Sequence, residues 1–305
     1  MSRLIDDIGA FLEANGFEYS FQIRDGFDVI SVKTPGGKHT RVILPLEIRA
    51  ASPGEARFAS MAAEECIRFI SVMEGYPIII PEDRWRRQPA MMKSRLLSHL
   101  EIFSQAYARN CEVRRIGKTE AKSFLEENHS YGYAACRYCY GLFLKRHTGH
   151  IAEEIRSFGC AQDEIEGAQD EIGRLIAVAT FSNARKWIKD GKEIRSYEWT
   201  RYASLPDMRV SGGMGKLLNA FIKEVHPDDI MSYADLEWSE GDVYDALGFT
   251  GEGRKDPVCF IVDGGSWRRF PIRSGMTGNF QGMTDAVFFR NFGSRKYRLK
   301  LTEYK

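Results

Sequence analysis

The stretch Val210-Ser211-Gly212-Gly213-Met214-Gly215-Lys216-Leu217-Leu218 governs how the centre of this 305-residue chain folds. It follows a strand-like run, and apolar residues then recur at helical spacing as far as Val225. Successive glycines let the backbone approach a ligand closely, and a helix N-terminus offers unpaired N–H groups with a partial positive charge. The stretch therefore predicts a phosphate- or pyrophosphate-binding turn to which Lys216 adds a charge, although many glycine turns only form a tight loop.

Strand-like and helical segments alternate on both sides of this turn. Patterning predicts helices at Lys118–Asn128, Gly213–Val225 and Gly241–Leu247, and strands at Tyr138–Leu144, Arg174–Phe181, Trp199–Leu205, Ile230–Asp235 and Pro257–Val262. This order indicates an α+β fold, in which helices flank one mixed, mostly antiparallel sheet.

The first hundred residues predict a separate, smaller α/β domain. Helical spacing begins at Leu4 and ends at Asn15-Gly16, and further helices are expected at Ala56–Val72 and Gln88–Phe103. Strands are expected at Tyr19–Ile23, Phe27–Lys33, Thr40–Ile48 and Tyr76–Ile80. We therefore expect domains at 1–108 and 109–270, followed by a basic extension at 271–305.

An acidic insertion is expected at 147–173. Residues 161–167 and 168–173 form a near-perfect tandem repeat, and residues 150–172 carry seven acidic side chains against one basic one. Like charge and low apolar content favour a solvated loop without a catalytic role.

Composition excludes several classes of protein. Hydrophobic residues make up 43% and charged residues 28%, and the formal net charge is +1, so no global attraction to nucleic acid or membrane is expected. The first residues are charged and no apolar run reaches the length of a spanning helix, which predicts a cytoplasmic protein without membrane contact. Cys136 and Cys139 form a lone C-x-x-C motif, more typical of reduced core thiols than of a metal site.

The C-terminal region is basic. Eleven Lys or Arg residues and four acidic residues lie between Arg254 and Lys305. The segment Val287–Leu299 suggests a β-hairpin turning at Phe292-Gly293-Ser294. Its interleaved aromatic and basic residues suit either an ordinary hairpin with a solvated face or a surface that contacts DNA.

The order strand, glycine turn, helix, strand and short helix ending in Tyr244-x-x-x-Gly248-Phe249 resembles the core of the GNAT superfamily of acyl-CoA-dependent transferases. The resemblance implies that residues 210–216 bind the pyrophosphate of acetyl-CoA or another acyl-CoA, and that Tyr244 acts as general acid on the departing thiolate. A thiolate needs a proton at neutral pH, which a positioned phenol can supply; a core tyrosine is the other interpretation. The family has Arg or Gln where Val210 stands here.

Further motifs occur in the order found in a GNAT-like module of phage and mobile-element proteins, homing-endonuclease-related and distantly similar to the phage Mom DNA-modifying enzyme. They are His129-Ser130-Tyr131-Gly132, Gly141-Leu142-Phe143, Leu175–Phe181, Glu198-Trp199-Thr200-Arg201 and Ser232-Tyr233-Ala234-Asp235. The resemblance implies one pocket with His129, Glu198 and Asp235 as catalytic residues beside Tyr244, and Arg201, Ser232 and Tyr233 as substrate-binding residues. Structural alternatives are an ion pair between Glu198 and Arg201, and caps at His129 and Asp235.

The N-terminal domain resembles the very-short-patch-repair and restriction-endonuclease fold, through Ile78–Trp85 and Lys93–Leu96. The resemblance makes Asp28 and Glu47 vestigial metal-ligand candidates. Arg49 stands where a lysine is expected, and arginine is a poor base. A degenerate nuclease fold retained for DNA docking or structure is therefore the favoured interpretation.

Two hypotheses follow for the whole chain. The first is an enzyme that transfers an acyl group from a small-molecule acyl donor to an amine, a nucleobase being one such acceptor. The second is a non-catalytic DNA-binding or accessory protein of a phage or mobile element.

Overall fold

The computed structural model describes residues 3–145, 173–189, 191–272, 283 and 285–304. The acidic repeat, and with it nearly all of the expected insertion at 147–173, lies outside the described residues. The chain divides into two compact units, each assembled from three separate stretches. The first unit contains Met1–Glu101, Ala234–Gly241 and Arg254–Arg295, and the second contains Ile102–Tyr233, Asp242–Gly253 and Lys296–Lys305.

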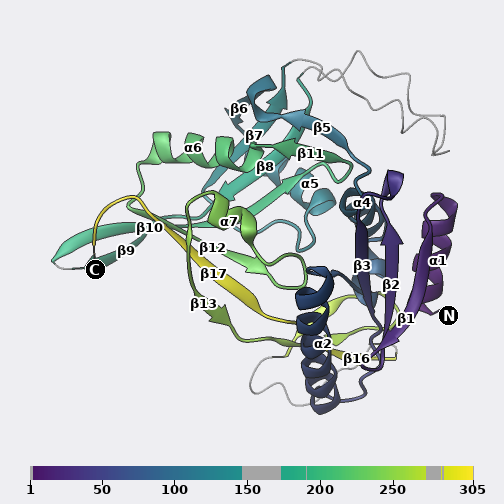
Figure 1. The fold of residues 1–305 in the computed structure, drawn as a ribbon. Coiled ribbons are helices and arrows are strands. Elements are labelled where there is room, and N and C mark those ends of the chain that lie inside the picture. The colour runs from purple at the N-terminus through teal and green to yellow at the C-terminus, as the bar shows by residue number, and fades with distance from the viewer. Residues whose placement is uncertain (1–2, 146–172, 190, 273–282, 284, 305) are drawn as a thin grey trace. The chain divides into compact units, whose positions relative to one another are not determined.

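The first unit begins with the succession helix, three strands, helix, strand (Figure 1). Its elements are α1 (Leu4–Ala14), β1 (Tyr19–Arg24), β2 (Phe27–Lys33), the 3₁₀ turn η1 (Pro35–Gly37), β3 (Thr40–Leu46), α2 (Pro53–Glu74), β4 (Ile78–Pro81), α3 (Glu82–Arg87), α4 (Pro89–His99), β14 (Cys259–Val262), β15 (Arg269–Pro271) and β16 (Val287–Arg290). The four-stranded sheet has the order β1-β2-β3-β4, in which β1, β2 and β3 are antiparallel and β4 is parallel to β3.

Local sequence explains the connections between the strands of this sheet. Asp25 and Gly26 connect β1 to β2 with φ angles of 50° and 81°, and two positive φ angles in a two-residue loop define the hairpin turn that best matches strand twist. Ser52 starts α2, because its Oγ accepts a hydrogen bond from the Glu55 backbone N–H at 3.2 Å. The parallel pairing of β3 with β4 then follows from the return of the chain through α2.

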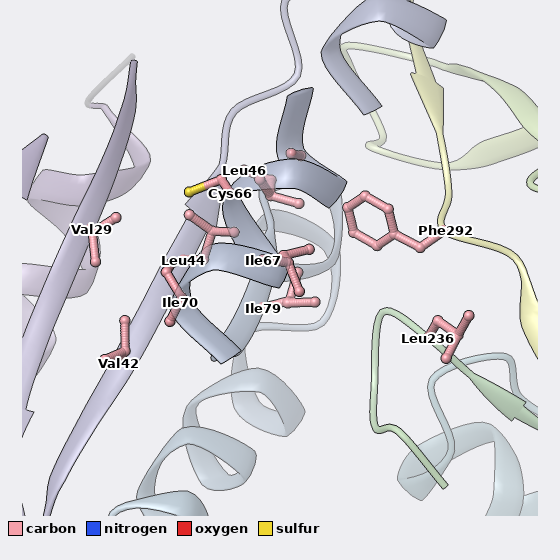
Figure 2. Packing of buried hydrophobic residues seen from close by; sticks show 11 residues of the cluster. Val29, Val42, Leu44, Leu46, Cys66, Ile67, Ile70, Ile79, Leu236 and Phe292 are labelled. Atoms are coloured by element: carbon pink, nitrogen blue, oxygen red, sulfur yellow. The ribbon is translucent and has the colours of Figure 1, made fainter. Parts of the chain in front are cut away.

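The core of the first unit lies between this sheet and α2 (Figure 2). Valines and leucines of β2 and β3 meet Cys66, Ile67 and Ile70 of α2, all of them buried. Leu236 and Phe292 complete the cluster and come from the two later stretches of the unit. Burial of apolar area against one core explains why sequence-distant segments belong to a single compact unit.

Two expectations about the C-terminal strands are wrong. The strand expected at Pro257–Val262 was assigned to the sheet of the second domain, but β14 pairs with β15 and β16 in a three-stranded sheet of the first unit. Residues 287–299 do not form a hairpin, because β16 pairs with β14, whereas β17 (Ser294–Lys300) lies between β12 (Asp229–Asp235) and β13 (Thr250–Lys255) in the eight-stranded sheet. Turn residues report a local change of direction, but strand pairing is decided by non-local contacts.

A buried ion cluster joins the three stretches of the first unit. The Arg84 guanidinium donates to Glu237 at 3.2 Å and to Asp235 at 3.1 Å. Arg269 donates to Glu237 at 2.8 Å and to both oxygens of Asp83. Burial alone would raise the pKa of Glu237, but Arg269 and Arg84 hold that pKa below its usual value. Each of the three carboxylates is therefore paired with at least one guanidinium inside the unit.

The second unit is built on one large sheet. Its elements are β5 (Ser104–Tyr107), the 3₁₀ turn η2 (Ala108–Asn110), β6 (Cys111–Arg115), α5 (Lys118–Asn128), β7 (Tyr138–Leu144), β8 (Leu175–Phe181), β9 (Arg185–Lys189), β10 (Lys192–Ser204), β11 (Met208–Ser211), α6 (Gly213–Val225), β12 (Asp229–Asp235), α7 (Asp242–Ala246), β13 (Thr250–Lys255) and β17. The strand order is β13-β17-β12-β10-β8-β7-β6, with β9 paired to β10. The protein is thus a mixed α/β protein, and the predicted bounds of α5, β7 and α6 are confirmed.

Helices α5 and α6 pack on opposite faces of this sheet. Phe221 of α6 stacks on Phe181 with ring centroids 3.9 Å apart and also contacts Tyr138 and Tyr140 of β7. Side chains of α5 pack instead around Cys139, which lies between those two tyrosines in sequence. Neighbouring residues of a strand point to opposite faces, so the two helices cover different sides. No helix among the described residues is long and apolar enough to cross a membrane.

Candidate functional site

The glycine turn leads directly into the N-terminus of α6. Gly212 precedes the helix with φ 75° and ψ 3°, a left-handed conformation that favours glycine. The short strand β11, which pairs in parallel with β5, fixes the approach to this turn. Among the described residues no side chain caps α6, so the backbone N–H groups of its first turn have no side-chain acceptor.

Close packing explains two further glycines. A Cβ at Gly213 would lie 2.8 Å from Val210 Cγ1 and 3.2 Å from the Tyr202 hydroxyl oxygen. A Cβ at Gly215 would lie 3.2 Å from Leu247 Cδ2, which follows α7. Val210, in the place of the family's Arg or Gln, therefore packs against the turn. The same contacts bring α7 onto the first turn of α6.

Lys216 and Ser211 have protein partners. The Lys216 ammonium donates to the carbonyl oxygens of Ala108 and Cys111 at 2.7 and 2.6 Å. The Ser211 hydroxyl oxygen accepts from Gln105 Nε2 at 3.2 Å. Both side chains tie the turn to the segment 105–111, and the backbone amides are left as the groups that can meet a ligand.

The parallel strands β10 and β12 separate beside this helix. They pair from Ser196 with Asp229 to Glu198 with Met231. Beyond this point β10 has a bulge between Trp199 and Arg201 and continues along β8. A side chain then replaces the ladder, because Ser232 Oγ donates to the Trp199 carbonyl oxygen at 3.1 Å. Where two parallel strands diverge, the freed strand edge can pair with an extended ligand.

Tyr244 of α7 lies at this divergence. Its hydroxyl is 2.9 Å from Ser232 Oγ. Since Ser232 donates its proton to the Trp199 carbonyl, the Tyr244 hydroxyl is the donor between the two side chains. The ring stacks on Tyr297 at 4.9 Å and contacts Phe249. Burial is the main cause that raises the pKa of Tyr244, so the phenol keeps its proton at neutral pH.

Arg201 and Glu198 have different hydrogen-bond and ion-pair partners. Arg201 donates to the Gly132 carbonyl at 3.0 Å and to the Thr200 carbonyl at 2.7 Å. Burial lowers the pKa of Arg201, and Glu198 acts in the opposite direction. The ion pair of Glu198 in the described residues is with Arg185 at 3.9 Å. Gly132, for which the sequence motif implied no role of its own, thus binds the arginine through its carbonyl.

The other expected site residues lie as follows. His129 ends α5, and its Nδ1 accepts the Tyr131 backbone N–H at 3.1 Å. Tyr233 follows Ser232 on β12 and is half-buried. Asp235 belongs to the first unit, where it accepts hydrogen bonds from Arg84 and from the Glu237 backbone N–H. Burial and Glu237 raise the pKa of Asp235. The structure therefore brings Ser232 and Tyr244 together and pairs Asp235 elsewhere.

The vestigial metal-ligand candidates lie at one end of the sheet in the first unit. Arg3, whose importance no sequence pattern indicated, contacts Asp28, and its Nε is 3.8 Å from Glu47. Arg49 pairs with the fully buried Glu82 at 2.7 Å. Among the described residues no cluster of three or more His, Cys, Asp or Glu side chains could hold a metal ion.

The fold and site define a two-unit mixed α/β protein with an uncapped helix at diverging parallel strands. No protein-family model matches the chain, and no curated protein matches it significantly in sequence. Among solved structures, Eis1 from Mycobacterium abscessus matches with a TM-score of 0.31 and 14% identity, over 50% of this chain and 34% of that chain. So small an overlap says nothing about activity.

Proposed function

We propose that the second unit is an acyl-CoA-dependent N-acyltransferase of the GNAT type. The observation that supports this most is the uncapped N-terminus of α6, which follows β10 and β11 and precedes β12 at the place where β10 and β12 diverge. Anions bind at such a terminus through backbone N–H groups and the helix dipole. Acetyl-CoA or another acyl-CoA combines the required anion, its pyrophosphate, with an extended amide-bearing arm suited to the edge of β10 beyond its pairing with β12.

In this proposal the amides of Gly213, Met214 and Gly215 bind the pyrophosphate. The acceptor amine attacks the thioester carbon, the C–S bond breaks, and Tyr244 donates its proton to the leaving sulfur while the amine nitrogen loses one to solvent. Ser232 positions the phenol through the 2.9 Å contact. The bound acyl donor supplies the activated carbonyl.

The acceptor side is assigned to the other residues of the second unit. Arg201, Tyr233, Glu198 and His129 are proposed to contact the amine substrate, a nucleobase among the candidates. Asp235 is left out, because its carboxylate is paired with Arg84 at 3.1 Å. Tyr244 is therefore the proposed acid. Solvent, or a group on the acceptor side, takes the proton that the amine nitrogen loses.

A matched pair of variants at Gly212 tests the anion site. Gly212 is exposed, and a Cβ there would be 3.5 Å from Ala108 Cβ, an ordinary contact. Asn and Asp both tolerate left-handed backbone, so Gly212→Asn and Gly212→Asp differ mainly in charge. We expect Gly212→Asp to bind acetyl-CoA about tenfold more weakly than Gly212→Asn, because the carboxylate repels the pyrophosphate.

Isothermal titration and thermal shift measure this difference. Acetyl-CoA at 100 times its Kd should stabilise the wild type by about 2.7 kcal/mol. Absence of any shift at millimolar acetyl-CoA would contradict the transferase, and equal affinities of the two variants would contradict the location of the pyrophosphate.

A second candidate function concerns the first unit. Arg3 neutralises Asp28, and its Nε lies 3.8 Å from Glu47, so a guanidinium stands beside the two carboxylates that a nuclease would use for metal. We infer a degenerate nuclease fold that docks DNA without cutting it. Binding to duplex DNA should weaken steeply as salt rises, because phosphate contacts release counterions. A flat salt response would contradict it.

A further inference from the structure

The first unit contains a pocket of about 220 Å³. Its walls are the start of β2, the end of β3 with the following loop, one face of α2, and β16 with Phe292. Ala56, Ala59 and Ala63 leave room along the α2 face. Pockets for drug-sized ligands measure about 300–1,000 Å³. A single ring system therefore fits, and a whole dinucleotide does not.

The charged groups of the pocket balance. Asp28, Glu47, Arg49 and Arg290 line it, and the Arg49 guanidinium lies 3.5 Å from the Glu47 carboxylate. A simple cation would meet two guanidinium groups and a simple anion two carboxylates, so neither is favoured by the total charge. Phe27, Phe288 and Phe289 add flat apolar surface. The pocket favours a neutral aromatic ring with hydrogen-bond donors at one edge and acceptors at another.

The contact between Arg3 and Asp28 indicates that the ligand presents hydrogen-bond donors to Asp28. The Arg3 guanidinium contacts Asp28 through Oδ2, while Oδ1 has no hydrogen-bond partner among the described residues. Glu47 is more fully used, since its Oε1 also accepts the Leu4 backbone N–H at 3.3 Å. A carboxylate only accepts hydrogen bonds, and a planar N–C–N fork of N–H groups matches its two oxygens. Asp28 already meets one such group in Arg3.

The acceptor edge is indicated by Arg290. Its Nη1 donates to Ser60 at 3.0 Å and lies 3.9 Å from Glu64. Its Nε and Nη2 make no hydrogen bond with the part of the chain that the structure describes. Paired acceptors such as guanine O6 and N7 are the usual partners of a guanidinium fork. Guanine also carries adjacent N1–H and N2–H donors, whereas adenine and cytosine do not.

We propose that this pocket binds a guanine base, with Asp28 accepting from its N1–H and N2–H groups and Arg290 donating to its O6 and N7. The phenylalanine side chains stack on the ring. Arg3 competes for Asp28 in the free protein. The assignment does not depend on acyl transfer by the second unit.

Nucleoside binding to the full chain, measured by isothermal titration, tests the assignment. The wild type should bind guanosine at least about tenfold more tightly than adenosine, cytidine or xanthosine, the difference expected for one bidentate contact. Comparable affinity for all four nucleosides, or no binding at millimolar concentration, would overturn it.

Asp28→Asn makes the test specific. An asparagine side chain offers one acceptor and one donor, and this matches the O2 acceptor and N1–H donor of xanthine. The variant should therefore prefer xanthosine to guanosine. A purely structural Asp28 would leave the order unchanged, and that result would reject the proposal. Circular dichroism and the Tm confirm that the variant folds.

Arg3→Ala removes the competitor. If Arg3 occupies Asp28 two-thirds of the time, the Kd for guanosine should fall about threefold, because apparent affinity scales with the competent fraction. An increased Kd would mean that Arg3 belongs to the ligand site and would contradict competition. If the protein bound Mg²⁺ through Asp28 but did not bind guanosine, the pocket would be a cation site and the proposal would be wrong.

The source of the base is distinguished by two further ligands. A single-stranded oligo-dT with one dG that binds more tightly than both GMP and oligo-dT assigns the pocket to a base held within nucleic acid. GMP that binds as tightly as this oligonucleotide assigns it to a free nucleotide. Either result supports guanine recognition, and equal binding of both oligonucleotides with no binding of GMP would contradict it.

Discussion

Replacing Tyr244 by Phe is expected to lower the kcat of acyl transfer by about 100-fold or more, with little change in the Kd for acetyl-CoA. A positioned general acid typically contributes a factor of about 100 to 10,000. The substitution removes only the hydroxyl, which lies 2.9 Å from Ser232 Oγ, and leaves the ring to stack on Tyr297. Release of free thiol from acetyl-CoA, with the amine that gives the highest wild-type rate, measures the effect.

Tyr140→Phe is the matched control for this substitution. Tyr140 is also buried, and its hydroxyl donates to Glu224 near the other end of α6 at 2.9 Å. Loss of that hydroxyl should lower stability and leave kcat within a few-fold of the wild type. Equal losses of kcat in the two variants would mean that Tyr244 supports only packing.

The pH dependence provides an independent check. Burial raises the pKa of Tyr244, so the acid form persists above the ordinary tyrosine pKa of about 10. The wild-type kcat should therefore fall only at a pH above that value. Tyr244→Phe should lack this decline, because no phenol remains to lose its proton.

Replacing Arg269 by Met is expected to lower the free energy of unfolding of the first unit by about 3–5 kcal/mol. The guanidinium of Arg269 binds Asp83 and Glu237, which are only 2% and 1% exposed. Removing one member of a buried ion pair leaves an uncompensated charge in a medium of low polarity. Total stabilities of about 5–15 kcal/mol make a loss of this size easy to detect in urea.

Lys33→Met is the matched control, because it makes a similar change at an exposed pair. The Lys33 and Glu18 side chains are 64% and 80% exposed and 3.0 Å apart, and such pairs contribute less than about 1 kcal/mol. Similar losses in the two variants would show that the buried cluster contributes no more than a surface pair.

The effect of Arg269→Met should diminish at low pH. Arg269 and Arg84 hold the pKa of Glu237 below its unfolded value, so the stabilisation is present above that unfolded value, about 4.3, and is lost as pH falls through the folded pKa. In the variant the pKa rises and protonation removes the unpaired charge. Wild type and variant should therefore converge at acidic pH.

Individual elements were predictable wherever the pattern was long and bounded by clear signals. The helix α6 begins at Gly213 and ends at Val225 as expected, because apolar spacing and the glycine turn both fix its position. The strand β7 likewise follows from a continuous apolar run at Tyr138–Leu144. The hydroxyl groups of Ser232 and Tyr244 were also proposed for one site, and the structure brings them together.

The sequence did not predict which strands pair with each other, nor which site residues already have hydrogen-bond or ion-pair partners in the fold. The segment around Gly293 was interpreted as a hairpin turn, yet its carbonyl accepts the Leu236 backbone N–H, and a Cβ there would collide with the Lys255 carbonyl. The family resemblance implies a catalytic role for Asp235 on β12, but Arg84, far away in sequence, binds its carboxylate. No sequence pattern indicated that Arg3 would contact Asp28.

The sequence by itself determined most of the helices, the strands with long apolar runs and the glycine turn, because periodicity and backbone propensity act between residues a few positions apart. Only the tertiary structure decided that three separate stretches build each unit, that β14 pairs outside the large sheet, and that Arg84 and Arg269 pair with Asp83, Asp235 and Glu237. A strand shows which of its faces is buried but not which neighbour it pairs with, and a charge does not reveal its distant counter-ion, because both depend on contacts that the fold creates.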